Sequence, residues 1–136
     1  MPQLAHLTIT EIYAGLTALL LVYTSVRVTM ARAKHKVFLG DGGKKEMIQV
    51  IRIQGNLIEY APMALILIGL LELGGTAPWL LHVLGIVFIV ARLIHATVNL
   101  ADATSKTRAI AATATWLVIL AGGVLTLAMT QGLVVK

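Results

Sequence analysis

Apolar residues along this chain gather into four long runs separated by shorter polar segments. The runs cover about residues 8–30, 48–71, 78–99 and 109–131. Each is long enough for an α-helix to cross the hydrocarbon core of a bilayer, which takes ~20 residues. The first run is longer than a signal-peptide core and no Lys or Arg precedes it, so we interpret it as a retained helix. The pattern predicts an all-α fold, a four-helix integral membrane bundle forming one domain over residues 1–136.

The polar segments between the runs differ in charge, and this difference predicts the orientation of the chain. The segment at 72–78 carries no basic residue, and the segment at 101–108 carries Lys106 and Arg108. The first loop and its flanks hold the most: Arg27, Arg32, Lys34, Lys36, Lys44 and Lys45. Because basic residues favour the cytoplasmic side, the first and third loops are expected there, with both termini in the periplasm of an inner membrane.

Composition agrees with a membrane protein and limits its chemistry. Hydrophobic residues make up 58% of the chain and charged residues 12%, whereas soluble domains have about a quarter charged. The net charge of +5 is explained by membrane topology, so no nucleic acid partner is expected. With no cysteine in the chain, any thiol must come from a substrate. The four histidines show no metal-ligand spacing, so no metal is expected.

The second apolar run is interrupted by polar residues that share one helical face. Arg52, Asn56 and Glu59 follow one another at offsets of four and three, which places them on one stripe. Gln54 points roughly to the opposite side and Tyr60 to one flank. Charged side chains within a span are expensive and usually face the bundle interior or a polar cavity. One explanation is pairing between helices; the other is a binding site.

The third run repeats this pattern with Arg92, His95 and Asn99. A site that combines arginines with a carboxylate suits a small zwitterion with more acids than amines. Glutathione has that charge pattern, as do other acidic peptides, and composition alone does not choose between them. His95 has a second explanation, a hydrogen bond to a carbonyl of a neighbouring helix.

A sequence motif in the second run narrows the choice. The pattern Arg-x-Gln-x-Asn-x-x-Glu-Tyr-x-Pro occupies Arg52, Gln54, Asn56, Glu59, Tyr60 and Pro62. With Ala31-Arg32 and Ala91-Arg92-Leu93, it resembles the MAPEG family, the membrane-associated proteins in eicosanoid and glutathione metabolism, over essentially the whole chain. The chain looks closest to small bacterial inner-membrane members and is similar to the microsomal glutathione transferases. The resemblance implies a homotrimer with glutathione bound between subunits near the cytoplasmic side.

The resemblance also implies roles for individual residues. The implied glutathione contacts are Arg32, Arg52, Gln54, Asn56, Glu59 and Tyr60, and the stripe on the third run adds Arg92 and His95 as ligand-binding candidates. The eicosanoid branch has tyrosines where this chain has His95 and Asn99. The family's thiol-activating arginine lies near the start of the fourth helix, where either Lys106 or Arg108 could serve; we take Arg108 as catalytic. Lowering a thiol pKa from ~8.5 to ~6.5 raises the thiolate fraction at pH 7 from about 3% to roughly 75%.

Three functions remain open. The first is a glutathione transferase or peroxidase that presents the glutathione thiolate to a lipophilic electrophile from the bilayer. The second is a membrane protein that binds glutathione or another acidic metabolite without catalysis. The third is a small proton-coupled exporter, suggested by the size of the chain and by Glu11 in the first helix.

Overall fold

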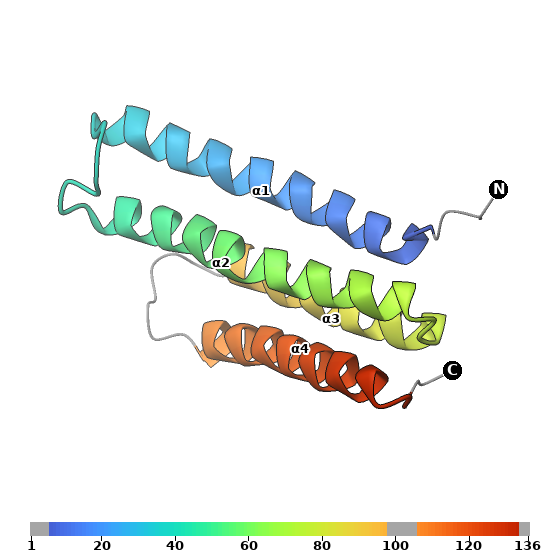
Figure 1. The fold of residues 1–136 in the computed structure, drawn as a ribbon. Coiled ribbons are helices and arrows are strands. Elements are labelled where there is room, and N and C mark those ends of the chain that lie inside the picture. Colours follow the sequence, from blue (N-terminus) through green and yellow to red (C-terminus); the bar gives the residue numbers. More distant parts are fainter. Residues whose placement is uncertain (1–5, 98–105, 134–136) are drawn as a thin grey trace.

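The computed structural model describes residues 6–97 and 106–133, and these form four antiparallel α-helices (Figure 1). The helices are α1 (Thr8–His35), α2 (Lys45–Leu73), α3 (Pro78–Thr97) and α4 (Lys106–Thr130). All four are long and apolar enough to cross a membrane. The predicted all-α four-helix bundle is confirmed.

The helix ends differ from the predicted spans because apolar runs do not mark where a helix stops. The first helix continues five residues past the predicted end at residue 30, since Ala, Arg and Lys are good helix formers in water. It ends where Lys36 adopts a left-handed conformation with φ 54°. The second and fourth helices each begin three residues earlier than predicted. The predicted end of the third helix, at Asn99, lies outside the described residues.

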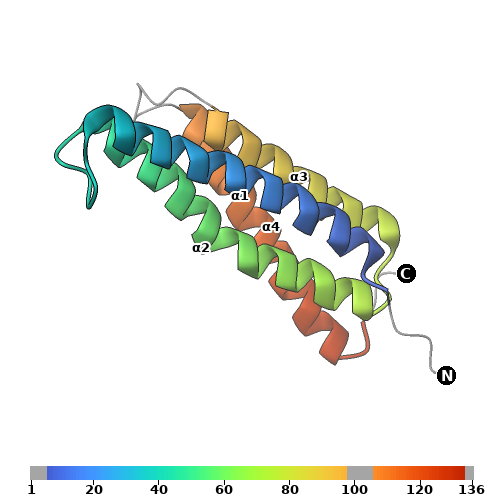
Figure 2. The same cartoon turned by 90° about the horizontal axis from the view of Figure 1, so that it is seen from above.

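Helices α2 and α3 form the central layer of the bundle, with α1 on one side of it and α4 on the other (Figure 1). Helix α1 packs on α2 and α3, and α4 packs on the same two helices (Figure 1). Viewed from above, α1 lies between α2 and α3 (Figure 2). The core between them is apolar and includes Leu57, Ile68, Leu81 and Phe88, each almost fully buried. The two central helices therefore contact every other helix, and side chains on them can be shared across the bundle.

A carboxylate from α2 holds the beginning of α1. The Glu72 carboxylate accepts hydrogen bonds from the backbone N–H groups of Ile9 and Thr10, both at 2.7 Å, and from the Thr10 hydroxyl at 2.6 Å. The first N–H groups of a helix have no partner within the helix, and Leu7 at the N-cap supplies none. Glu72 therefore caps α1 from another helix and aligns the ends of α1 and α2.

Tyr13 joins α1 to α3 near the same end of the bundle. Its hydroxyl lies 2.9 Å from His82 Nδ1 and 3.2 Å from the His82 carbonyl oxygen. The ring packs directly against Gly85, where a Cβ atom would overlap the Tyr13 ring carbons. A glycine at this position thus allows α1 and α3 to approach closely.

Candidate functional site

The polar stripe of α2 lies partly on the outside of the bundle. Arg52 and Glu59 are exposed and Asn56 is half-buried between them. Glu59 is fourteen residues from each end of the 29-residue helix, which is about 43 Å long at 1.5 Å per residue. The Glu59 carboxylate is therefore at the middle of the span. In the described residues neither Arg52 nor Glu59 takes part in an ion pair.

Gln54 faces away from this stripe, as the helical spacing predicted. Its side-chain amide donates a 2.7 Å hydrogen bond to the Ser25 hydroxyl of α1. This contact uses the amide nitrogen and leaves the carbonyl oxygen for another donor. Helix α2 therefore has polar partners on more than one side, and Gln54 contributes to the α1–α2 contact.

Arg92 extends from α3 into the interior and contacts two other helices. Its side chain is buried, with only 2% of its surface exposed. The guanidinium donates to Asn56 Oδ1 of α2 at 3.2 Å and to the Ala111 carbonyl of α4 at 3.3 Å. It also lies over the Tyr60 ring, 5.8 Å from the ring centre. The structure therefore brings Asn56, Tyr60 and Arg92 together, and the Arg92 Nε has no hydrogen-bond partner there.

The remaining candidates on α3 and α4 lie close to this cluster along their helices. His95 is buried, one turn after Arg92 on α3. Arg108 is half-buried in the first turn of α4, one turn before Ala111, whose carbonyl accepts from Arg92. Lys106, the alternative to Arg108, begins α4 and is exposed. Asn99 lies outside the described residues.

Arg32 is placed apart from the Arg92 cluster, at the end of α1. One guanidinium nitrogen, Nη1, donates to the carbonyl oxygens of Val37 and Phe38, both at 3.3 Å, and of Gly40 at 3.0 Å. These bonds hold the loop after α1 in place. Within one chain Arg32 therefore supports the loop and is not brought to the stripe of α2.

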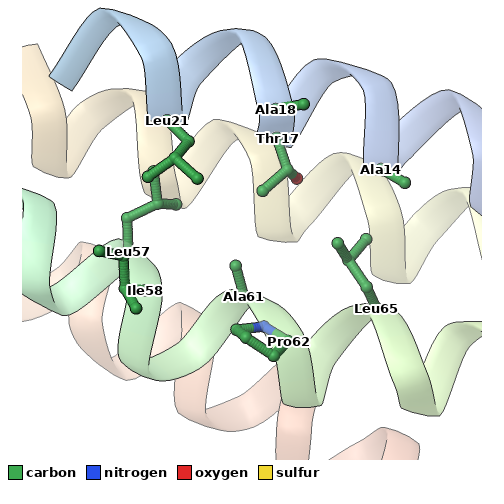
Figure 3. A pocket seen from close by; sticks show the side chains of 9 residues that line it. All are labelled: Ala14, Thr17, Ala18, Leu21, Leu57, Ile58, Ala61, Pro62 and Leu65. Atoms are coloured by element: carbon green, nitrogen blue, oxygen red, sulfur yellow. The ribbon is translucent and has the colours of Figure 1, made fainter. Parts of the chain in front are cut away.

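An apolar groove of about 260 Å³ lies between α1 and α2, beside Pro62 (Figure 3). Thr17 supplies its only hydroxyl, and that hydroxyl donates to the Tyr13 carbonyl at 2.7 Å. The other lining side chains are all apolar: Ala14, Ala18, Leu21, Leu57, Ile58, Ala61, Pro62 and Leu65. Because Ile58 and Pro62 flank Glu59 along the helix, the groove lies next to the polar stripe.

No three His, Cys, Asp or Glu side chains lie close enough to hold a metal ion in the part of the chain that the structure describes. Glu11 is exposed in the first turn of α1. It is thus at the end of the bundle and far along the chain from the stripe of α2.

Comparison with known proteins identifies the family. The MAPEG family profile matches residues 10–128. The chain belongs to the MAPEG family. This is a family of membrane proteins whose members often bind glutathione. The resemblance that the α2 motif predicted is confirmed.

Two curated MAPEG relatives come from Escherichia coli. The chain is 41% identical over 87 residues to the inner membrane protein YecN of strain K12, and equally to the protein of that name from strain O6:H1 CFT073. The match covers 64% of this chain and 66% of each relative, just under two thirds of their length. No solved structure matches the chain.

Within one subunit of this MAPEG protein, the motif residues of α2 face two different directions. Asn56 and Tyr60 turn toward Arg92, whereas Arg52 and Glu59 face outward. The sequence left open both pairing between helices and ligand binding for the polar residues within the spans, and the structure shows an interhelical contact for Arg92. The signal for it was a basic residue in mid-run with no acidic residue one turn away on its own helix.

Proposed function

We propose that this MAPEG protein binds glutathione on the outward polar stripe of α2, between neighbouring subunits of a homotrimer in the bacterial inner membrane. The observation that carries the proposal is the exposure of Arg52 and Glu59 within the span of α2. A charged side chain at the centre of a span costs about 2.5–3.5 kcal/mol on insertion scales. A neighbouring subunit and a charged ligand would together remove both groups from contact with lipid.

The spacing of the two charges suits a short zwitterionic peptide. Arg52 and Glu59 are seven residues apart, which is about 10 Å along the helix axis. At that distance they do not neutralise each other well. An extended tripeptide is on the order of 10 Å long. Arg52 would donate to a carboxylate of glutathione in a fork geometry, and Glu59 would accept from its amino group.

The orientation in the membrane follows from the basic loop after α1. With the first loop in the cytoplasm, both termini are periplasmic and Arg52 lies toward the cytoplasmic end of α2. Glutathione would therefore enter from the cytoplasm. Arg32, at the edge of that loop, could reach the stripe of an adjacent subunit, which is consistent with its distance from the stripe of its own chain.

Catalysis would use Arg108 to stabilise the glutathione thiolate. The thiol proton leaves to water, the thiolate sulfur attacks the electrophilic carbon, a C–S bond forms, and the leaving group departs with its electron pair. A cation beside the sulfur favours the thiolate. The apolar groove beside Pro62, which has no unused hydroxyl, is a suitable route for a lipophilic electrophile.

A second candidate is glutathione binding without catalysis, as in a sensor. It is favoured by the place of Arg108 in the first turn of α4, where the side chain is only half-buried. Water around a guanidinium screens its effect on a nearby thiol. In this case glutathione binds and its thiol keeps its ordinary pKa.

Activity measurements on the purified protein in detergent separate the two candidates. The test combines glutathione with chlorodinitrobenzene or a lipid hydroperoxide and follows both turnover and the ultraviolet absorbance of the thiolate. Transferase or peroxidase function predicts turnover that Arg108→Ala reduces at least tenfold, with Lys106→Ala as the matched control. Binding with neither thiolate absorbance nor turnover would support the non-catalytic candidate.

A further inference from the structure

Among the described residues, the buried Arg92 guanidinium makes one hydrogen bond to another side chain, that of Asn56. Its other hydrogen bond is to the Ala111 carbonyl, and the Tyr60 ring covers one side of the guanidinium. Among the described residues no carboxylate pairs with it. Burying such a group is costly without good partners. The contact with Asn56 therefore contributes both to the stability of the bundle and to the orientation of Asn56.

The chemistry of the two side chains determines that orientation. A guanidinium has five N–H donors and no acceptor, whereas an asparagine amide has an acceptor oxygen and a donor nitrogen. Only Oδ1 of Asn56 can therefore face Arg92, as the 3.2 Å bond shows. The Nδ2 group must point elsewhere. Asn56 is half-buried beside the polar stripe, so this donor is available there.

We infer that Arg92 is a positioning residue that holds Asn56 as a hydrogen-bond donor, so that the ligand group opposite Asn56 is a carbonyl or carboxylate oxygen. This inference rests on the proposed binding of glutathione to this stripe. A free asparagine amide can rotate and accept from a ligand as readily as it donates. Held by Arg92, it favours an oxygen acceptor and disfavours an ammonium group.

The consequence is a fixed direction for the ligand along α2. Arg52 and Asn56 both offer donors, and Glu59, one turn further on, offers an acceptor. The acidic end or a peptide carbonyl of glutathione then lies at Arg52 and Asn56, and the amino group lies at Glu59. The reverse orientation would place an ammonium group against two donors.

Asn56→Asp separates the two roles of the Asn56 side chain, which are to accept a hydrogen bond from Arg92 and to donate one to the ligand. The new carboxylate forms a salt bridge with Arg92 in which both partners are charged, whereas the asparagine acceptor is neutral, but it has no donor for the ligand. We expect Tm above that of the wild type and a glutathione Kd at least tenfold higher. Gln54→Glu is the matched control, because it adds the same charge on α2 but loses the donor to Ser25; its Tm should fall.

Substitution of Arg92 tests the same contact from the other side. Arg92→Met removes the hydrogen bond to Oδ1 and should raise the glutathione Kd several-fold. Arg92→Lys retains a donor and should recover part of that loss, which a purely packing role would not predict. Helical content and oligomeric state, measured for both variants, identify any loss caused by misfolding.

The outcomes distinguish this inference from the proposed function. Absence of glutathione binding by the wild type overturns the proposed function, and the Tm of Asn56→Asp then still tests the contact with Arg92. If the wild type binds and Asn56→Asp binds equally well, Asn56 is not a required donor and the inference fails. A Tm of Asn56→Asp at or below that of Asn56→Ala also overturns it.

Discussion

Removal of the Glu72 carboxylate should destabilise the bundle by loosening the start of α1. Glu72 accepts two backbone N–H groups and one hydroxyl, all at 2.6–2.7 Å. Losing a helix cap costs about 0.5–2 kcal/mol, and a hydrogen bond to a charged group contributes about 1.5–3 kcal/mol. Because the three bonds share one carboxylate, their contributions are not additive. We expect Glu72→Ala to lower the free energy of unfolding by about 2–3 kcal/mol.

Matched variants assign that loss to the cap. Thr10→Val removes only the hydroxyl bond and should cost about 1 kcal/mol. Glu11→Gln removes a carboxylate from the same first turn of α1 that makes no such bonds in the described structure, and should cost about 0.5 kcal/mol or less.

Chemical denaturation in detergent measures the free energies, and hydrogen exchange of the Ile9 and Thr10 amides reports local opening. The Glu72→Ala variant should exchange both amides faster than the wild type. A loss for Glu72→Ala no greater than that for Glu11→Gln would refute the capping role.

Two other contacts give predictions of opposite kinds. Gly85→Ala places a Cβ atom against the Tyr13 ring and should destabilise the bundle by about 1–3 kcal/mol through overpacking. Gly15→Ala meets open space and should stabilise the bundle by about 0.4–1 kcal/mol. Thermal unfolding compares the two variants, and equal effects would contradict the close packing of Gly85 on Tyr13. Glu46→Gln weakens an exposed pair with Lys34 and a half-buried one with His35 and should lower Tm less than Gly85→Ala does. The small decrease in Tm for Glu46→Gln should vanish at high salt. A large decrease in Tm that does not depend on salt would contradict a weak surface interaction.

The helices and the motif could be predicted because both depend on local sequence. Apolar runs of sufficient length predict spans, and spacing alone placed Arg52 and Glu59 on one face of α2. The helix ends could not be predicted in the same way. Beyond Met30 the residues continue to favour a helix in water, so polarity and helix termination do not coincide.

The contacts between helices needed the structure. Asn56 and Arg92 are 36 residues apart, and Ile9 and Glu72 are 63 apart. Helical periodicity gives the face of a side chain but not the neighbouring helix that it meets. For that reason the sequence did not identify Asn56 and Ala111 as the partners of Arg92 on α2 and α4; ligand binding by Arg92 stays a prediction. The same limit applies to Arg32, whose partners are loop carbonyls.

The most direct test of the account is calorimetric titration of glutathione into the purified protein in detergent, with its oligomeric state measured in the same sample. The proposed site predicts saturable binding to a trimer, with Kd at least tenfold higher for Arg52→Ala and for Glu59→Gln. Gly15→Ala, on the exposed side of α1, should bind as the wild type does. No binding at millimolar glutathione, or equal binding by Arg52→Ala, would contradict a glutathione site on the polar stripe of α2.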